Sequence, residues 1–327
     1  MKNQKKQISL LISIDTECDK GKNWIVKYPF QYESIYSGIN SYLLLFCKKF
    51  SIKPTFFISP EIFFDKKSCG ILSNFPNCEL ATHLHSEYIP PDEKLHTEVT
   101  SDVQTNLSIE IEYEKLFGLT KNFFITFGFS PISFRAGRFG LSKNTISVLS
   151  DLKYMADSSV TPFRSVKFDN GQSVNYWGSP VYPYITNGID PRVPTKKGLL
   201  EVPISTSIPK FQRYPLRLLR FLGNHPFFRK KLMNLFKLND KAIYIRPMKA
   251  TTQELIQKTD EILNNWPKNH PRLIHIMFHS VELIANASPA VQNNDQLALF
   301  QDNLEGIVTH LLSNYTVDCR TISEMKI

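Results

Sequence analysis

Short apolar runs alternate along the chain with stretches of helical spacing, which predicts strands and helices in turn. The apolar runs predict six buried strands, at residues 8–14, 54–58, 78–82, 132–134, 199–204 and 273–277. The helical spacing predicts six helices, at residues 34–49, 61–74, 100–126, 143–152, 252–265 and 295–313. A terminal strand and helix are expected within residues 316–326.

Repeated strand–helix units favour an α/β fold with a parallel sheet, and seven or eight of them favour closure into a (β/α) barrel. An open doubly wound sheet is the alternative. The first predicted strand runs into SIDTECD with no glycine-rich loop, which argues against nucleotide and dinucleotide binding.

Two stretches depart from this alternation. Turn residues cluster near 160–195, where we expect a loop-rich insertion. Residues 210–249 hold eleven Lys or Arg and one acid, a net charge of +10 in a chain whose formal total is +9. Leu and Phe alternate there with the basic residues, so a pair of basic amphipathic helices is expected. We otherwise expect one catalytic domain over residues 1–327.

This basic segment has two interpretations. It is either the solvated face of an outer helix or a contact with an anionic membrane surface or lipid-linked glycan. Nucleic acid is not expected as a partner, because no recognition motif accompanies the charge.

The composition, 42% hydrophobic and 21% charged, is typical of a globular protein. No export signal or bilayer-spanning run is visible, so a cytoplasmic location is expected, with the protein peripheral to the inner membrane if the basic segment binds lipid. Five cysteines without paired spacing indicate reduced thiols, and Cys18 is interpreted as a packing residue.

Polar groups follow the predicted strands where a barrel places its catalytic residues. Asp15 and Glu17 follow the first strand, and the next groups are His83-Leu-His85, Arg135 and His279. His83 and His85 lie two residues apart and share one face of an extended chain. With a carboxylate from Asp15 or Glu17 they would form a metal site with open positions for water and substrate.

Five motifs in order carry a family resemblance: SIDTE (13–17), PTFF (54–57), ELATH (79–83), SFRAG (133–137) and MFHS (277–280). They resemble the motifs of the NodB-homology polysaccharide deacetylases, the carbohydrate esterase 4-like superfamily. The resemblance covers about residues 8–325. It is nearest to the branch with HLH and FRAG motifs that is associated with bacterial surface-polysaccharide loci.

This resemblance implies a distorted (β/α) barrel of about seven parallel strands that removes an acetyl or related acyl group from an amino sugar. It implies Asp15 as the base, Arg135 as the residue that holds this base, and His279 as the acid that protonates the leaving amine. It also implies a divalent metal, with zinc the expected ion. Glu17, His83 and His85 are the expected ligands.

The sequence departs from the family pattern at two positions. Thr16 replaces the second Asp of the first motif, so Glu17 has to substitute for it as a ligand. Glu87 stands where the second motif has its second His, which leaves either His85 or Glu87 as ligand. A catalytically silent glycan-binding barrel and a metal-independent amidase are therefore alternatives.

The remaining candidates concern substrate and structure. Tyr176 and Trp177, in a turn-rich segment, offer aromatic surface for stacking on a sugar or for packing. Ser280 lacks the sharp turn that a serine nucleophile needs, and His275 is interpreted as structural. Three further charged residues are expected to contact substrate around the mouth: Arg138, Glu87 and Glu282.

Overall fold

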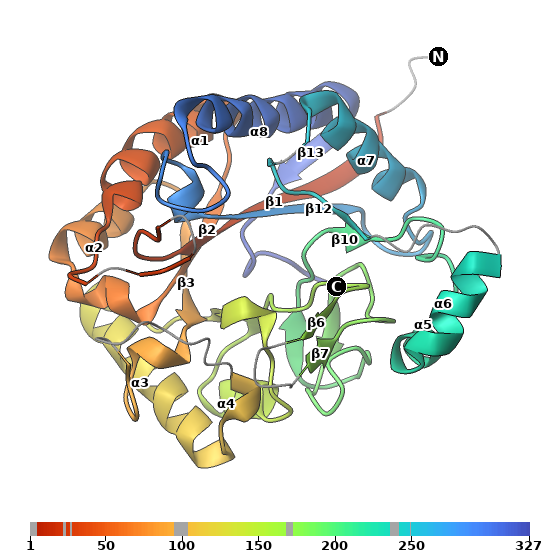
Figure 1. Ribbon diagram of the computed structural model, residues 1–327, viewed down its shortest axis with the longest axis horizontal. Coiled ribbons are helices and arrows are strands. Elements are labelled where there is room, and N and C mark those ends of the chain that lie inside the picture. Colours follow the sequence, from red (N-terminus) through yellow and green to blue (C-terminus); the bar gives the residue numbers. More distant parts are fainter. Residues whose placement is uncertain are drawn as a thin grey trace.

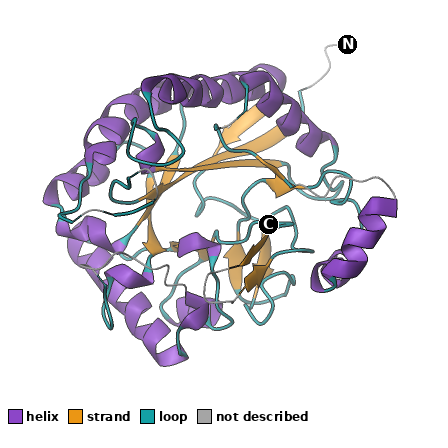
Figure 2. Ribbon diagram, in the orientation of Figure 1, coloured by secondary structure: helices purple, strands orange, loops and turns teal. Residues whose placement is uncertain are grey.

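The computed structural model describes residues 5–21, 24–26, 28–94, 104–167, 173–235, 242–248 and 250–327. Its main sheet is curled, and helices cover the outside of the curl (Figures 1 and 2). Seven strands run parallel along the sheet, in the order β12 (Leu273–His279), β1 (Gln7–Thr16), β2 (Pro54–Ile58), β3 (Glu79–Leu84), β4 (Ser133–Ala136), β5 (Ala156–Asp157) and β9 (Leu199–Glu201). The prediction of a distorted (β/α) barrel with about seven parallel strands is confirmed.

Two more strands extend this sheet. β8 (Tyr184–Thr186) pairs antiparallel with β9, and β13 (Thr316–Cys319) runs parallel to the first residues of β1. Two short antiparallel ribbons lie apart from it, β6 (Ser165–Lys167) with β7 (Ser173–Asn175), and β10 (Thr206–Ser207) with β11 (Ile243–Tyr244). β6, β7 and β8 lie in the predicted loop-rich insertion, of which residues 168–172 are outside the described chain.

The outer helices follow the predicted order. They are η1 (Ser34–Leu43), which continues into α1 (Leu44–Phe50), and α2 (Lys66–Ser73), α3 (Ile109–Phe127), α4 (Thr145–Asp151), α5 (Leu216–Asn224), α6 (Pro226–Leu235), α7 (Thr252–Asn264) and α8 (Asn294–Asn314). Single turns of helix lie at η2 (Pro60–Phe64), η3 (Ser86–Tyr88), η4 (Gln104–Asn106), η5 (Gly137–Phe139) and η6 (Ser280–Glu282). No helix of the described residues is long and apolar enough to cross a membrane.

Local capping explains where several helices begin and end. The Ser108 side chain accepts from the Ile111 amide at the start of α3, and Gly128 ends that helix with φ +80°. Residues 100–103, at the start of the helix predicted for 100–126, lie outside the described chain. The helix predicted for 61–74 is interrupted, because Asp65 is extended and its side chain caps α2 at Ser68.

The gap between β9 and β12 is bridged by the chain that follows β9. The His275 amide donates to Ser205 Oγ at 2.8 Å, and the Ser205 amide donates to the His275 carbonyl at 3.3 Å. His275 Nδ1 lies 3.1 Å from the Pro203 carbonyl oxygen. His275 thus fastens the closing edge of the barrel, which is the structural role expected for it.

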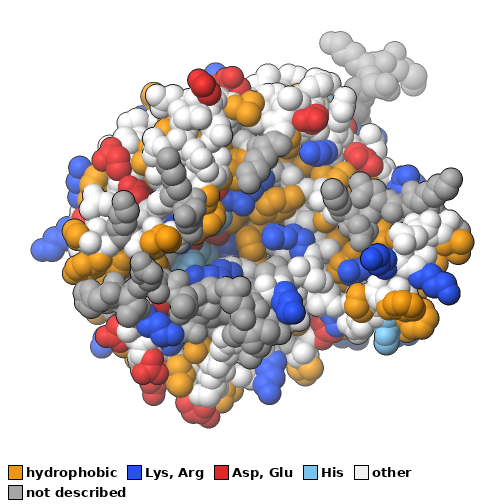
Figure 3. Space-filling view, in the orientation of Figure 1, with side chains coloured by type: hydrophobic (Ala, Val, Ile, Leu, Met, Phe, Trp, Pro, Cys, Tyr) orange, Lys and Arg blue, Asp and Glu red, His pale blue; other side chains and the backbone are white. Residues whose placement is uncertain are grey.

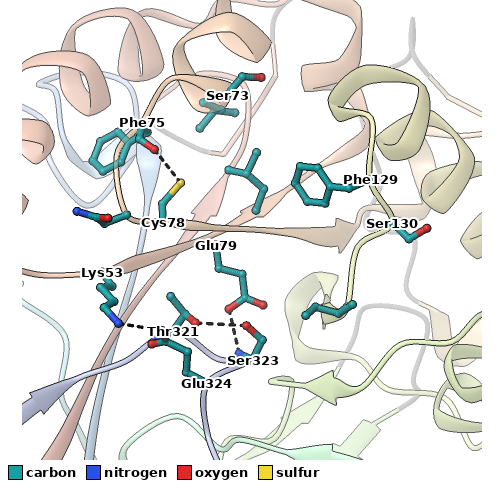
Figure 4. Close-up of a pocket in the computed structure, with 14 residues that line it drawn as sticks. Lys53, Ser73, Phe75, Cys78, Glu79, Phe129, Ser130, Thr321, Ser323 and Glu324 are labelled. Carbon is teal, nitrogen blue, oxygen red and sulfur yellow. Dashed lines mark hydrogen bonds and ion pairs between the residues drawn. The ribbon is translucent and has the colours of Figure 1, made fainter.

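The C-terminal residues cover the opposite end of the barrel, where the strands begin. Ile322 is buried and its amide donates to Thr55 Oγ1. The Ser323 amide donates to Glu79 Oε2 (Figure 4). A pocket of about 560 Å³ lies beside this contact. The prediction of a helix at the end of the chain is wrong. These residues form an irregular segment that runs past the starts of the strands.

A candidate active site at the strand ends

The base expected at Asp15 is fixed by a fully buried arginine. Arg135, on β4, donates from Nη1 to Asp15 Oδ1 at 2.5 Å and from Nη2 to Ser13 and Ser158, each at 2.9 Å. Its guanidinium also lies over the Phe57 ring, 4.1 Å from the centroid. A planar guanidinium held by several acceptors has one orientation, so the Asp15 carboxylate is held in one position.

Burial raises the pKa of Asp15, but the charges of Arg135, His83 and His279 together outweigh this effect. The pKa of the carboxyl is therefore held below its ordinary value. Asp15 is ionised at neutral pH and can accept a proton.

The imidazole of His279 faces this carboxylate from the neighbouring strand. Asp15 and His279 are register partners between β1 and β12, and Asp15 Oδ2 lies 3.9 Å from His279 Nε2. The other ring nitrogen, Nδ1, lies 3.2 Å from Glu282 Oε1 and 2.7 Å from Arg246 Nη2. Arg246 and Glu282 are themselves an ion pair. His279 is thus held by its Nδ1 edge while its Nε2 edge faces Asp15.

Glu17, His83 and His85 are buried and form the group that could hold a metal, with one ligand atom from each inside a 4.8 Å span. Glu17 Oε1 lies 3.2 Å from His83 Nε2 and 2.9 Å from His85 Nε2. His83 Nδ1 lies 3.0 Å from the Arg135 carbonyl oxygen. That oxygen can only accept, so Nδ1 carries the hydrogen and neutral His83 presents a lone pair at Nε2.

Two acceptors therefore face each other at His83 Nε2 and Glu17 Oε1, unless a proton or a cation lies between them. A divalent cation with two imidazole ligands and one carboxylate ligand satisfies this arrangement, and the donor set suits zinc. The residues present fit the metal that the family resemblance implies.

Lys20 also approaches the site. Its buried ammonium forms an ion pair with the second oxygen of Glu17. Burial raises the pKa of Glu17, but Lys20 and the two imidazoles outweigh it, so the pKa of Glu17 lies well below its usual value. Glu17 is therefore a carboxylate shared by two imidazoles and an ammonium.

Glu87 lies behind His85. His85 directs Nε2 to Glu17 and Nδ1 to Glu87 at 3.3 Å, and Glu87 also accepts from Arg138 Nη2 at 2.7 Å. The sequence left either His85 or Glu87 as the third candidate ligand. In the structure it is His85 that lies close to Glu17 and His83. Glu87 is fully buried, so it supports His85 and has no exposed surface for the substrate contact expected of it. The Arg138 side chain is partly exposed above it.

Of the two roles left open for Tyr176 and Trp177, sugar stacking and packing, the structure shows packing. Tyr176 is fully buried and its hydroxyl donates to the Phe139 carbonyl, while Trp177 is 2% exposed and packs edge-on against Phe211. Gly178, with φ +81°, turns the chain inward against Arg220. The turn-rich segment therefore supplies core packing in place of a sugar platform.

Three residues near the site were missed by sequence reasoning. Lys20 and Trp24 lie in the loop after β1, and the Trp24 ring is 5.3 Å from that of His279. Arg246 was counted only within the basic segment. Arg246 directly follows the short apolar run 242–245 and precedes Pro247. This position at the end of a strand-like run could have distinguished Arg246 from the other basic residues of the segment.

Comparisons with known proteins show the fold. No protein-family model and no curated protein matches this chain. Among solved structures, a protein of Mycobacterium smegmatis assigned as a polysaccharide deacetylase aligns with a TM-score of 0.54 at 12% identity, over 99% of this chain and 90% of that one. A protein of Pseudomonas aeruginosa PAO1 assigned to the same class aligns at 0.52 and 12% identity, over 97% and 88%.

PuuE allantoinase aligns at a TM-score of 0.51 and 12% identity, over 99% of this chain and 90% of its own. At these identities the likeness is one of fold. The chain has the NodB-like fold that polysaccharide deacetylases share, as the five ordered motifs led us to expect.

Proposed function

We propose that this chain is a hydrolase that removes an acetyl or related acyl group from an amino sugar of a surface polysaccharide or its precursor. The observation that carries the proposal is the pairing of an ionised Asp15, fixed by Arg135, with His279 at 3.9 Å across the mouth. One group can accept a proton while the other supplies one, as amide hydrolysis requires.

The proposed reaction uses these groups in order. Asp15 accepts a proton from a water molecule, whose oxygen bonds to the acyl carbon and forms a tetrahedral intermediate. His279 then donates a proton to the sugar nitrogen as the carbon–nitrogen bond breaks, which releases a carboxylic acid and an amine. Arg246 and Glu282 hold the His279 ring so that Nε2 faces the reacting atoms.

Glu17, His83 and His85 would hold a divalent metal in this site. When bound, such a metal lowers the pKa of water and polarises the acyl carbonyl. A metal-independent amidase is the second candidate, and the buried Lys20 favours it, because an ammonium already neutralises Glu17.

Acetate release from a panel of N- and O-acetylated oligosaccharides tests the reaction. We expect release by the wild type and a loss of at least about 100-fold in Asp15→Asn and His279→Ala, since each removes a proton-transfer group. Circular dichroism should show both variants folded. Unchanged turnover in either variant would refute its assigned role, and no release by the wild type from any substrate would favour a silent glycan-binding barrel.

Elemental analysis tests the metal separately. We expect a near-stoichiometric divalent metal in the wild type and its loss in His83→Ala and His85→Ala. His310→Ala is the matched control, because that imidazole pairs with Asp260 at the outer helices. Absence of metal from the wild type, together with measurable acetate release, would establish the metal-independent amidase.

A further inference from the structure

A second pocket opens beside the proposed acid. It has a volume of about 440 Å³. Its lining comes from the loop after β1, the chain just before β6, β11 and the chain after it, α7 and the loop after η6, and includes Trp24, Arg164, Tyr244, Arg246 and Lys258. Arg246 contacts both the pocket and His279, so the two sites adjoin. On the face shown in Figure 3, Lys and Arg side chains gather around the central hollow.

The lining of this pocket is cationic. Of the described residues that line it, three are Lys or Arg and none is Asp or Glu. Arg246 is paired with Glu282, but Arg164 has no carboxylate within ion-pair distance among the described residues. The Arg164 guanidinium instead lies near the Tyr244 ring, 5.3 Å from its centroid. Its hydrogen-bond donors are therefore available to an anion.

Two aromatic rings accompany these cations. Trp24 is 42% exposed. Tyr244 lies beside Arg164, and its hydroxyl donates to the sulfur of Met277, two residues before His279 on β12. Flat apolar rings pack on the faces of sugars, and neighbouring guanidinium groups bind carboxylate or phosphate. The pocket thus combines the two kinds of contact that an acidic sugar needs.

We propose that this pocket is a subsite for an anionic group, a carboxylate or a phosphate, carried by the glycan next to the acylated sugar. Arg164 and Lys258 bind the anion, and Trp24 and Tyr244 contact the sugar that carries it. The inference rests on the proposed function, which supplies the glycan as the class of substrate. Its test measures binding without turnover.

Isothermal titration of Asp15→Asn with three probes tests the subsite. The probes are N-acetylglucosamine, its 1-phosphate, and an N-acetylglucosamine–glucuronic acid disaccharide. We expect at least one anionic probe to bind about tenfold or more tightly than the neutral sugar. The two anionic probes distinguish phosphate from carboxylate recognition.

Arg164→Gln and Lys258→Gln should each reduce that preference by about fivefold or more, as removing one charged hydrogen-bond donor would. Lys121→Gln, an exposed charge change on α3, is the matched control and should leave the preference intact. Equal binding of neutral and anionic probes, or a preference unaffected by Arg164→Gln, would overturn the subsite even if hydrolysis is confirmed. A retained preference without hydrolysis would leave the subsite standing.

The helix pair α5–α6 carries a second, independent inference. The pair projects from the side of the barrel opposite α2 (Figure 1). Its outer surface exposes large apolar side chains, with Phe227 75% and Leu235 74% exposed and Leu218, Phe221 and Phe228 about half exposed. Between residues 213 and 235 there are six Lys or Arg and no acid.

Exposed aromatic and leucine side chains beside a segment rich in basic residues and without acids are typical of helices that lie in a membrane interface. The inner face of the pair packs against the rest of the protein, where Leu219, Leu222 and Met233 are buried. The outer face therefore matches a partner with both an apolar layer and negative charge.

We propose that α5–α6 docks the protein on an anionic lipid surface. Flotation with vesicles of phosphatidylglycerol and phosphatidylcholine should show binding that falls about fivefold or more when salt is raised from 0.05 to 0.5 M, because the attraction is screened. Pure phosphatidylcholine vesicles should bind weakly.

Phe227→Ser/Phe228→Ser and Lys230→Glu/Lys231→Glu should each abolish flotation. Lys66→Glu/Lys67→Glu on α2, at the far side of the molecule, is the charge-matched control and should float like the wild type (Figure 1). Absence of salt-sensitive flotation would overturn the proposal, as would self-association through the same phenylalanines in sedimentation without vesicles.

Discussion

Arg135 joins two parts of the site through different atoms. Its side chain holds Asp15, while its backbone carbonyl accepts from His83 and sets which nitrogen of that ring is free. A change of side chain therefore separates the two roles, because the backbone carbonyl remains in any variant.

Arg135→Lys should remove the contacts to Ser13 and Ser158 and leave Asp15 poorly placed. We expect acetate release to fall at least about 100-fold and the free energy of unfolding to fall by about 3 kcal/mol, the usual cost of disrupting a buried ion pair. Metal content should be unchanged. Elemental analysis, denaturant titration and acetate release measure the three quantities, and loss of metal would contradict the separation. Arg320→Lys, in an exposed pair, is the control.

His275 predicts a pH dependence of stability. Burial, then the charge of Arg135, lowers the pKa of this imidazole to about 3. The unfolded chain binds a proton near pH 6.5 while the folded chain does not, so this contribution to stability is complete above pH 6.5 and is lost as the pH falls toward 3. Between pH 7.5 and 5 the loss is roughly 2 kcal/mol.

Denaturant titrations of the wild type and His275→Gln at pH 7.5 and 5 measure this effect. The wild type should lose roughly 2 kcal/mol more than the variant between the two pH values. An equal loss in both proteins would show that His275 does not titrate differently on folding.

The sequence predicted the site residues that strands carry, and it missed or misplaced those that loops and turns carry. Asp15, His83, Arg135 and His279 lie in the last two residues of their strands, so strand order alone brings them together. Lys20 arrives from an irregular loop, whose path no periodicity describes. Glu87 was expected at the mouth, but the turn at η3 buries it behind His85.

At the scale of elements, α5 is attached to the barrel by close packing at Gly223. A Cβ atom at this position would clash with Trp177, although an alanine normally stabilises a helix relative to glycine. The same contact explains why Trp177 is buried, which its turn-rich sequence context did not indicate.

Gly223→Ala should therefore lower the free energy of unfolding by about 1–3 kcal/mol through overpacking. Gly70→Ala in α2, where a Cβ would meet no atom within 4 Å, should raise it by up to about 1 kcal/mol. Denaturant titration of both variants checks the contrast, and stabilisation by Gly223→Ala would contradict the packing.

Element boundaries were predictable where hydrophobic spacing and caps agree. The capping box of Thr251 and Glu254 begins α7 within a residue of its predicted start. The predicted terminal helix failed because Ile322 and Met325 are buried below the strand starts and do not form a helical stripe. The burial of these side chains in the folded protein thus determined the conformation of a segment whose apolar spacing had predicted a helix.

At the scale of the whole molecule, one end of the barrel holds the proposed catalytic residues and the other end is closed. At the closed end Glu79 accepts from Ser133 at 2.5 Å and from Thr55 at 3.1 Å, and the C-terminal residues complete its hydrogen bonding (Figure 4). Buried carboxylates are costly when they lose partners, so this end depends on the last residues of the chain.

Removal of residues 320–327 should lower the free energy of unfolding by about 3 kcal/mol or more, because Ile322 no longer fills the core and Glu79 loses a donor. Thermal and denaturant unfolding measure the loss. Ser323→Ala, which keeps the backbone amide that donates to Glu79, should change stability by less than about 0.5 kcal/mol. A truncated chain as stable as the wild type would show that the segment does not close the barrel.

The position of β1 has a consequence for how the protein is made. This strand carries Asp15, yet two of its neighbours, β12 and β13, come from the last part of the chain. During synthesis β1 leaves the ribosome well before β12 and β13, and its strand edges stay exposed until these strands follow. Pairings so distant in sequence form slowly, so the proposed base should be among the last groups to reach its final position.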